Sequence, residues 1–162
     1  TARFFDAYLV AERSAAYFCR FMHPQLVEEL VEIQVLHSAA VRDHDFLDIS
    51  RQNAVFHLRI AAATENPYII DFSGRLHNLA RRLSIFVYQI ELDQDGRLDE
   101  QQGYIVCEHM AIIDAIRAHD RKKLLELLTA HANRFQQRIS RFISGIRPDE
   151  GDVILHSTEV YR

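Results

Sequence analysis

Four side chains that could bind a divalent metal ion lie on the apolar sides of three predicted helices. Asn53 and His57 are four positions apart, so both lie on one helical face, which is otherwise apolar. His109 and His131 lie within apolar stripes of two later helices. Three imidazoles and one amide oxygen suit Zn²⁺, Ni²⁺ or another borderline divalent ion, and leave positions open for water or ligand. The pattern therefore predicts a metal site inside the domain.

A second interpretation of these histidines needs no metal. A buried imidazole can be satisfied by a hydrogen bond, and leaving it unpaired costs about 1–3 kcal/mol. A single inward histidine is therefore weak evidence for a ligand. Three inward histidines on three helices favour a shared site, although spacing alone leaves both interpretations open.

Several further residues are candidates for binding an effector in the same cavity. Arg81 and Arg82, on a long predicted helix, could hold a carboxylate through two parallel hydrogen bonds. His77, Tyr88 and Tyr104 could line the cavity. Each of these residues could equally lie on a solvated face or at the rim.

Other polar residues are expected to lie away from the site. Glu12 is predicted on or near the solvent face of the first helix. Glu108 precedes His109, and successive helical side chains are rotated by about 100°, so Glu108 is expected to face away. Five histidines in polar contexts or at helix ends are expected to be exposed: His23, His37, His44, His119 and His156.

The composition predicts one all-α domain. The chain has 162 residues, 48% of them hydrophobic and 26% charged, with only five glycines and three prolines to interrupt helices. Pro24 and Pro67 suit first helical turns. Helices are expected over residues 3–22, 24–41, 46–63 and 67–91, followed by two joined at 118–120. The core positions expected in the fourth helix are Phe72, Leu76, Leu79, Leu83, Phe86 and Ile90.

The charge pattern and the termini set further limits. A net charge of −4 without a dense basic cluster argues against direct DNA contact by this segment. Without a run of about 18 apolar residues, no membrane span is expected. Cys19 and Cys107 are too few for a disulfide framework and are expected to be reduced. Residues 147–162 are expected to form a loosely attached tail.

One loop partly matches a calcium-binding pattern. Glu91, Asp93, Asp95 and Gly96 approximate its first half, but Gln102 stands where a bidentate glutamate is required. A solvated turn is the better interpretation.

Two longer stretches carry a family resemblance. NAVFHLRIAAATENPYI is followed some fifty residues later by EHMAIIDAIRAHDRKKLLELLTAHANRF. Together they resemble the C-terminal effector domain of FadR-type regulators in the GntR superfamily, and the resemblance covers essentially Thr1 to Ile143. The positions that match the family pattern are Asn53, Phe56, His57, Asn66, Pro67, Glu108, His109, Ile112, Ala115, Ile116, Asp120 and His131.

The resemblance implies an antiparallel bundle of six to seven helices that encloses a ligand and metal cavity. It implies that Asn53, His57, His109 and His131 hold the metal, and that residues 1–146 form an effector-binding and dimerisation domain. The effector would be a small metabolite, commonly a carboxylate. The protein would be a bacterial, cytoplasmic transcription regulator and not an enzyme. Operator DNA would be bound only by an N-terminal winged helix-turn-helix that is absent from this chain.

The sequence departs from the family pattern at two positions. Asn53 stands where many members have Asp. A neutral amide should lower metal affinity and favour an anionic ligand that completes the coordination. Tyr8 stands where the family often has Arg, so no role is carried over to that position.

Two other functions stay open at this stage. A site with three histidines and a metal could be a small hydrolase, although no general base is evident. The domain could also be a metal-free dimerisation module whose histidines only form hydrogen bonds in the core.

Overall fold

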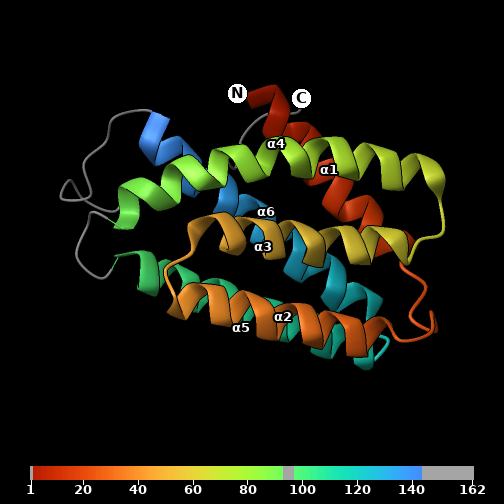
Figure 1. Cartoon of the computed structure of the whole chain (residues 1–162). Helices are drawn as coiled ribbons and strands as arrows, with labels where there is room; N and C mark the ends of the chain where they lie inside the picture. Colours follow the sequence, from red (N-terminus) through yellow and green to blue (C-terminus); the bar gives the residue numbers. More distant parts are fainter. Residues whose placement is uncertain (1, 93–96, 144–162) are drawn as a thin grey trace.

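The computed structural model describes residues 2–92 and 97–143, and 88% of these residues are helical, with no strand among them. The six helices are α1 (Ala2–Phe18), α2 (Leu26–Arg42), α3 (Phe46–Ala62), α4 (Pro67–Leu92), α5 (Arg97–Arg117) and α6 (Arg121–Ile143) (Figure 1). The predicted all-α fold is confirmed. The predicted tail over residues 147–162 lies outside the described residues, as do Asp93, Asp95 and Gly96 of the calcium-like pattern.

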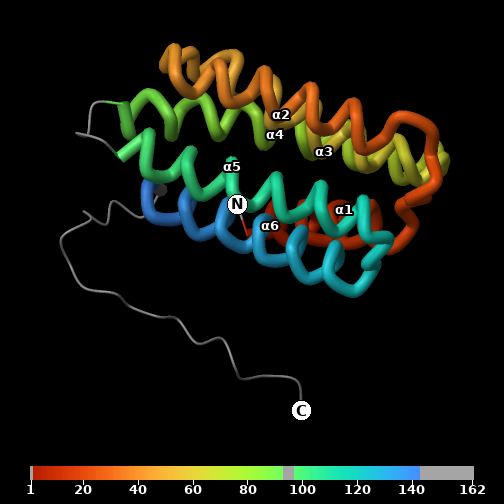
Figure 2. The backbone as a smooth tube through the Cα atoms, turned by 90° about the horizontal axis from the view of Figure 1, so that it is seen from below, coloured from red at the N-terminus to blue at the C-terminus, as the bar shows by residue number. Residues whose placement is uncertain are grey.

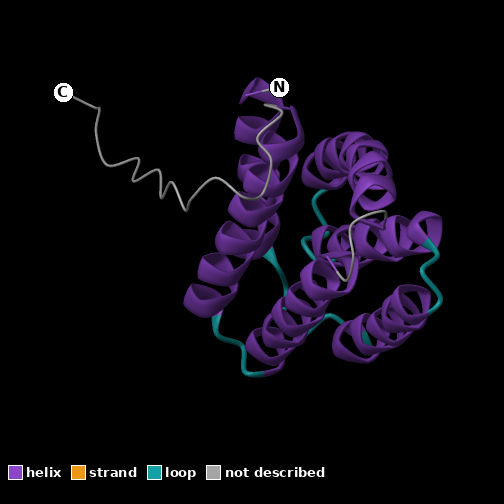
Figure 3. Cartoon of the chain, turned by 90° about the vertical axis from the view of Figure 1, so that its left-hand side faces the viewer, coloured by secondary structure: helices purple, strands orange, loops and turns teal. Residues whose placement is uncertain are grey.

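The helices pack so that the middle of each one can reach a shared interior. α3 packs between α2 and α4, and α5 packs on α2 and α6. α1 lies far from α6 in sequence but packs along it, and also contacts α4 and α3 (Figures 2 and 3). Among the described residues, no helix is long and apolar enough to span a membrane.

Local signals explain where several helices begin. Asp45 caps α3, since its carboxylate accepts a hydrogen bond from the Asp48 backbone N–H at 3.0 Å. Asn66 caps α4 in the same way through the N–H of Tyr68, also at 3.0 Å. The expectation that Pro24 begins a helix is wrong. α2 begins at Leu26 because Gln25 has a left-handed backbone with φ 62°.

The core positions predicted for α4 are largely wrong. Phe72, Leu79 and Phe86 are 38%, 44% and 61% exposed. The buried face of α4 consists instead of Ser73, His77, Ala80, Ser84, Val87, Tyr88 and Glu91. The more polar side of α4 therefore faces inward, toward the site described below.

Two apolar clusters lie toward opposite ends of the bundle. The larger one joins the C-terminal halves of α1, α3 and α5 to the N-terminal halves of α2 and α6, and includes Leu30, Phe56, Ile60, Ile112, Ile116, Leu124 and Leu128. The smaller one includes Phe5, Ile49, Val87 and Ile139. The buried polar residues described next come from the stretches of helix between these clusters.

Candidate metal centre and ligand pocket

The centre of the bundle is a layer of buried polar side chains to which every helix contributes. Its members are Glu12, Gln34, His37, His57, His77, His109 and His131, all of them buried. Three of these imidazoles converge. Each of His57, His109 and His131 offers a ring nitrogen, and the three atoms lie within 4.8 Å of one another.

Each converging imidazole has its Nδ1 atom held by an acceptor from another helix. His57 Nδ1 donates to Glu12 Oε2 at 2.8 Å, and His131 Nδ1 donates to Glu108 Oε2 at 2.9 Å. His109 Nδ1 donates to Gln34 Oε1 at 2.7 Å. These bonds place the protons on Nδ1, so the Nε2 lone pairs are available to a cation.

Three expectations about residues outside the site are wrong. Glu12 is only 2% exposed, because α1 packs against both α4 and α6. Glu108 points away from its neighbour His109 but reaches across to α6, where it accepts a hydrogen bond from His131. His37 is fully buried, and its ring centroid lies 5.4 Å from that of His109.

The remaining polar residues follow the expectations only in part, because His23 and Glu91 are less exposed than expected. His44 is exposed and contacts Asp99 on the surface, and His119 is also exposed. His23 is partly buried, and His156 lies outside the described residues. Both cysteines are free, Cys19 buried and Cys107 exposed. Glu91, the first residue of the calcium-like pattern, is buried and pairs with Arg138.

Both ring nitrogens of His37 are buried without a hydrogen-bond partner among the described residues. Two further buried atoms at this centre, His109 Nε2 and Asn53 Oδ1, also lack a partner there. An unpaired buried acceptor costs about 1–3 kcal/mol. A divalent cation would accept lone pairs from both atoms and from the Nε2 atoms of His57 and His131. The donor set of three imidazoles and one amide therefore fits a borderline divalent metal ion.

A second group of potential metal ligands shares His57 with the first group. Glu12, His57 and His77 also have atoms within 4.8 Å of one another. Both carboxylate oxygens of Glu12 are already engaged, since Oε1 accepts from His77 Nε2 at 2.7 Å and Oε2 accepts from His57. We therefore interpret Glu12 as the residue that orients His57.

The charges at this centre follow from burial and from these hydrogen bonds. Burial alone would raise the pKa of Glu12, but His57 and His77 hold this pKa well below its usual value. Burial lowers the pKa of His57 to about 4 and that of His109 well below its usual value. These two imidazoles are therefore neutral near pH 7, as a metal ligand must be.

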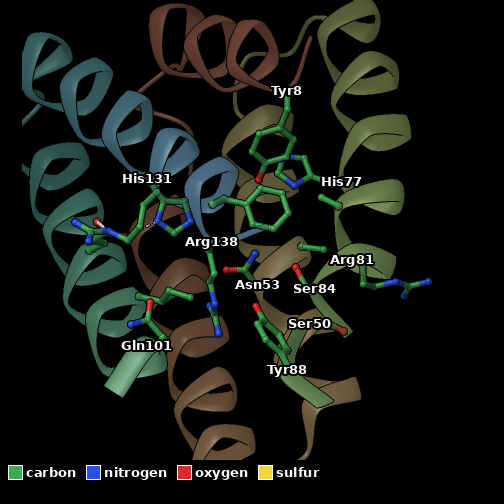
Figure 4. Close-up of a pocket in the computed structure, with 16 residues that line it drawn as sticks. Tyr8, Ser50, Asn53, His77, Arg81, Ser84, Tyr88, Gln101, His131 and Arg138 are labelled. Carbon is green, nitrogen blue, oxygen red and sulfur yellow. Dashed lines mark hydrogen bonds and ion pairs between the residues drawn. The ribbon is translucent and has the colours of Figure 1, made fainter. Parts of the chain in front are cut away.

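A small pocket of about 20 Å³, partly open to solvent, lies beside His131, one of the three converging histidines (Figure 4). Asn53 and His131 line it, as do His77 and Arg81 from the predicted effector set. Arg82 is exposed and is not among the lining residues. Tyr104 lines a neighbouring pocket instead. Tyr88, the other candidate cavity aromatic, lines the pocket. Further lining residues that were not expected include Tyr8, Ser50, Ser84, Gln101 and Arg138.

Arg138 is the least expected of these lining residues. It is buried and forms a two-pronged ion pair with Glu91, in which Nε donates to Oε1 at 2.9 Å and Nη2 to Oε2. Its guanidinium also lies 4.7 Å from the centroid of the Tyr88 ring. The sequence carries a local signal for this burial, since Arg138 lies three positions after Phe135 and four before Phe142, on the apolar stripe of α6.

Fold and pocket together define an all-helical domain with a pocket between its helices. The model of the FCD domain family matches residues 7–134. The chain belongs to this family, the C-terminal effector-binding domains of GntR-type regulators. A comparison with curated proteins finds no match.

Proposed function

We propose that this effector domain senses a small carboxylate metabolite at a metal centre formed by Asn53, His57, His109 and His131. One observation carries the proposal: the three imidazoles have their Nδ1 atoms held while their other nitrogens converge, and Asn53, four positions before His57 on α3, has a buried oxygen without a partner among the described residues. A bound Zn²⁺ or Ni²⁺ would supply a fixed positive charge in a cavity of low dielectric.

The pocket residues would recognise the rest of the effector. Arg81 lines the pocket but is exposed, and its guanidinium points outward in Figure 4, so it would have to turn inward to bind a carboxylate. The hydroxyl groups of Tyr8, Ser84 and Tyr88 can donate to or accept from polar groups of the ligand. Because Asn53 is neutral, an anionic ligand would balance more of the metal's charge than it would beside an aspartate.

The proposed regulation follows from where these residues originate. The pocket lining comes from α1, α3, α4, α5 and α6, so a bound effector would bridge most of the bundle. A ligand shifts a conformational equilibrium only by its difference in affinity for the two arrangements. We expect this shift to alter the spacing of two DNA-binding domains in a cytoplasmic homodimer, whose N-terminal winged helix-turn-helix domains would contact operator DNA.

The metal-free dimerisation module remains the second candidate. His57 Nε2 and His131 Nε2 lie 3.2 Å apart, so a shared proton could satisfy both atoms without a metal. That arrangement leaves the buried His109 Nε2 and Asn53 Oδ1 unpaired, which favours the metal-binding interpretation.

A hydrolase is disfavoured by the carboxylates that the structure places near the histidines. Glu12 accepts hydrogen bonds from two histidines, and Glu108 accepts from His131 and from Arg134. Neither carboxylate is free to act as a general base toward a bound water.

Calorimetry tests the proposed function. Small mono- and dicarboxylates would be titrated into zinc-loaded wild-type protein, His109→Ala and the surface control His44→Ala. We expect one carboxylate class to bind the wild type and the control, and to bind His109→Ala much more weakly. Equal binding to all three proteins would contradict a metal-centred effector site.

A further inference from the structure

A second pocket, lined by arginines, lies between the start of α5 and the end of α6. It measures about 100 Å³, and its lining residues are Arg97, Gln101, Tyr104, Arg134, Gln137, Arg138, Arg141 and Phe142. Four of these eight residues are arginines, and none is acidic. The pocket adjoins the effector pocket, since Gln101, Arg134 and Arg138 line both.

The arginines of this pocket differ in how their charge is balanced. Arg134 pairs with Glu108, and Arg138 pairs with Glu91. Arg97 is half-buried, and its Nε atom is buried without a hydrogen-bond partner among the described residues. A buried unpaired donor costs about 1–3 kcal/mol, and more when it is charged. An anion in the pocket would pair with this donor and reduce the repulsion between neighbouring guanidinium groups.

We propose that this arginine pocket is a phosphate-binding site, separate from the metal centre. The planar guanidinium fork matches the oxygens of a phosphate group and can donate two parallel hydrogen bonds to it. The pocket volume of about 100 Å³ is well above the roughly 10–15 Å³ that a single water needs on this measure, so the pocket has room for a phosphate group. None of the four proposed metal ligands lines the pocket, so the proposal does not depend on the metal.

Hydrogen bonds connect this proposed phosphate site to the effector pocket. Glu108 accepts hydrogen bonds from both Arg134 and His131, at 2.7 and 2.9 Å. A bound phosphate would draw Arg134 away from Glu108. The Glu108 carboxylate, which orients His131, would then lose one of its two hydrogen-bond partners. Occupancy of the arginine pocket would therefore alter ligand affinity at the metal centre, and the coupling would be reciprocal.

Phosphate titration of chelator-treated protein tests the site without the metal centre. Inorganic phosphate and glycerol phosphate would be titrated by calorimetry into the wild type, Arg97→Gln, Arg97→Lys and the control Arg75→Gln, with folding checked by circular dichroism. Arg75 is an exposed arginine of α4 that pairs with Asp71. Loss of a charge-assisted hydrogen bond should weaken phosphate binding about tenfold to a hundredfold in Arg97→Gln. Arg97→Lys keeps the positive charge but loses the planar guanidinium, so it should bind phosphate with intermediate affinity. Arg75→Gln should bind phosphate like the wild type.

Binding of both probes supports a phosphate site, and the order of their affinities indicates the natural ligand. Tighter binding of glycerol phosphate would indicate a phosphorylated metabolite, and equal or weaker binding would indicate the free anion. Binding that appears only after zinc is restored would place phosphate at the metal centre and overturn the proposal. Unchanged binding by folded Arg97→Gln, or no binding by the wild type, would also overturn it.

Discussion

His57 Nε2 and His131 Nε2 lie 3.2 Å apart in the centre of the bundle, although the two residues are 74 positions apart in the chain. Both imidazoles donate their Nδ1 hydrogens to carboxylates, Glu12 for His57 and Glu108 for His131. One of the two Nε2 atoms must therefore carry a proton if these atoms are hydrogen-bonded to each other. A metal ion and this shared proton are alternative ways to satisfy the same pair of nitrogens.

Restoring a charged ligand at position 53 should strengthen metal binding. Asn53 Oδ1 is buried and unpaired among the described residues, so a carboxylate would meet the cation at the same place with a full negative charge. We expect Asn53→Asp to bind zinc at least about tenfold more tightly, and Asn53→Leu to bind it more weakly. Competition with a fluorescent zinc chelator would measure both. Weaker binding by folded Asn53→Asp than by the wild type would show that residue 53 does not face the metal.

Glu12→Gln should weaken the site although Glu12 is not among its proposed ligands. A glutamine side chain has one oxygen to accept from two imidazole N–H groups, so either His57 or His77 would face an amide donor. Loss of such an outer-shell partner typically lowers metal affinity about 10- to 100-fold. Glu126→Gln, on the exposed side of α6, serves as the control and should bind zinc like the wild type. The same affinity in both variants would mean that Glu12 does not orient His57.

The buried ion pair between Glu91 and Arg138 should matter more for stability than the exposed pair between Asp71 and Arg75. Glu91→Gln leaves a buried guanidinium without its countercharge, and such losses cost about 3–5 kcal/mol. Asp71→Asn should change the free energy of unfolding by no more than about 0.5 kcal/mol, because both partners are exposed. Urea unfolding would compare the two, and similar small effects would contradict the importance of the buried pair.

The two cysteines should differ sharply in reactivity. Burial raises the pKa of the Cys19 thiol to about 11, so only about one molecule in a thousand carries a thiolate there at pH 8. Cys107 lies exposed on α5. A disulfide reagent such as dithionitrobenzoate should therefore modify one thiol quickly in the native protein and the second only after unfolding. Cys107→Ser should remove the fast phase, and a fast phase that survives in this variant would show that Cys19 is accessible.

The inward positions of the central histidines could be predicted because their neighbours fix a helical face. His57, His109 and His131 each sit at a spacing of three or four from leucine, isoleucine or phenylalanine residues, and the structure brings the three imidazoles together. Metal binding by these residues and Asn53 stays a prediction.

The positions of side chains could not be predicted where the inner face of a helix is polar. In α4 the apolar residues are expected to point inward, but His77 and Ser84 face the pocket while Phe86 is exposed. Glu12 was misplaced for the same reason. One signal could have located Glu12, because it lies four positions after Tyr8 and four before Ala16, both of which are buried.

Metal content tests the central claim most directly. Protein purified without a metal-affinity column would be dialysed against zinc, freed of excess ion and analysed by elemental mass spectrometry. The wild type would be compared with His131→Ala and His44→Ala, with folding checked by circular dichroism. We predict close to one divalent ion per chain in the wild type and in His44→Ala, and none in His131→Ala. A wild type without metal, or a folded His131→Ala that retains it, would contradict the metal centre.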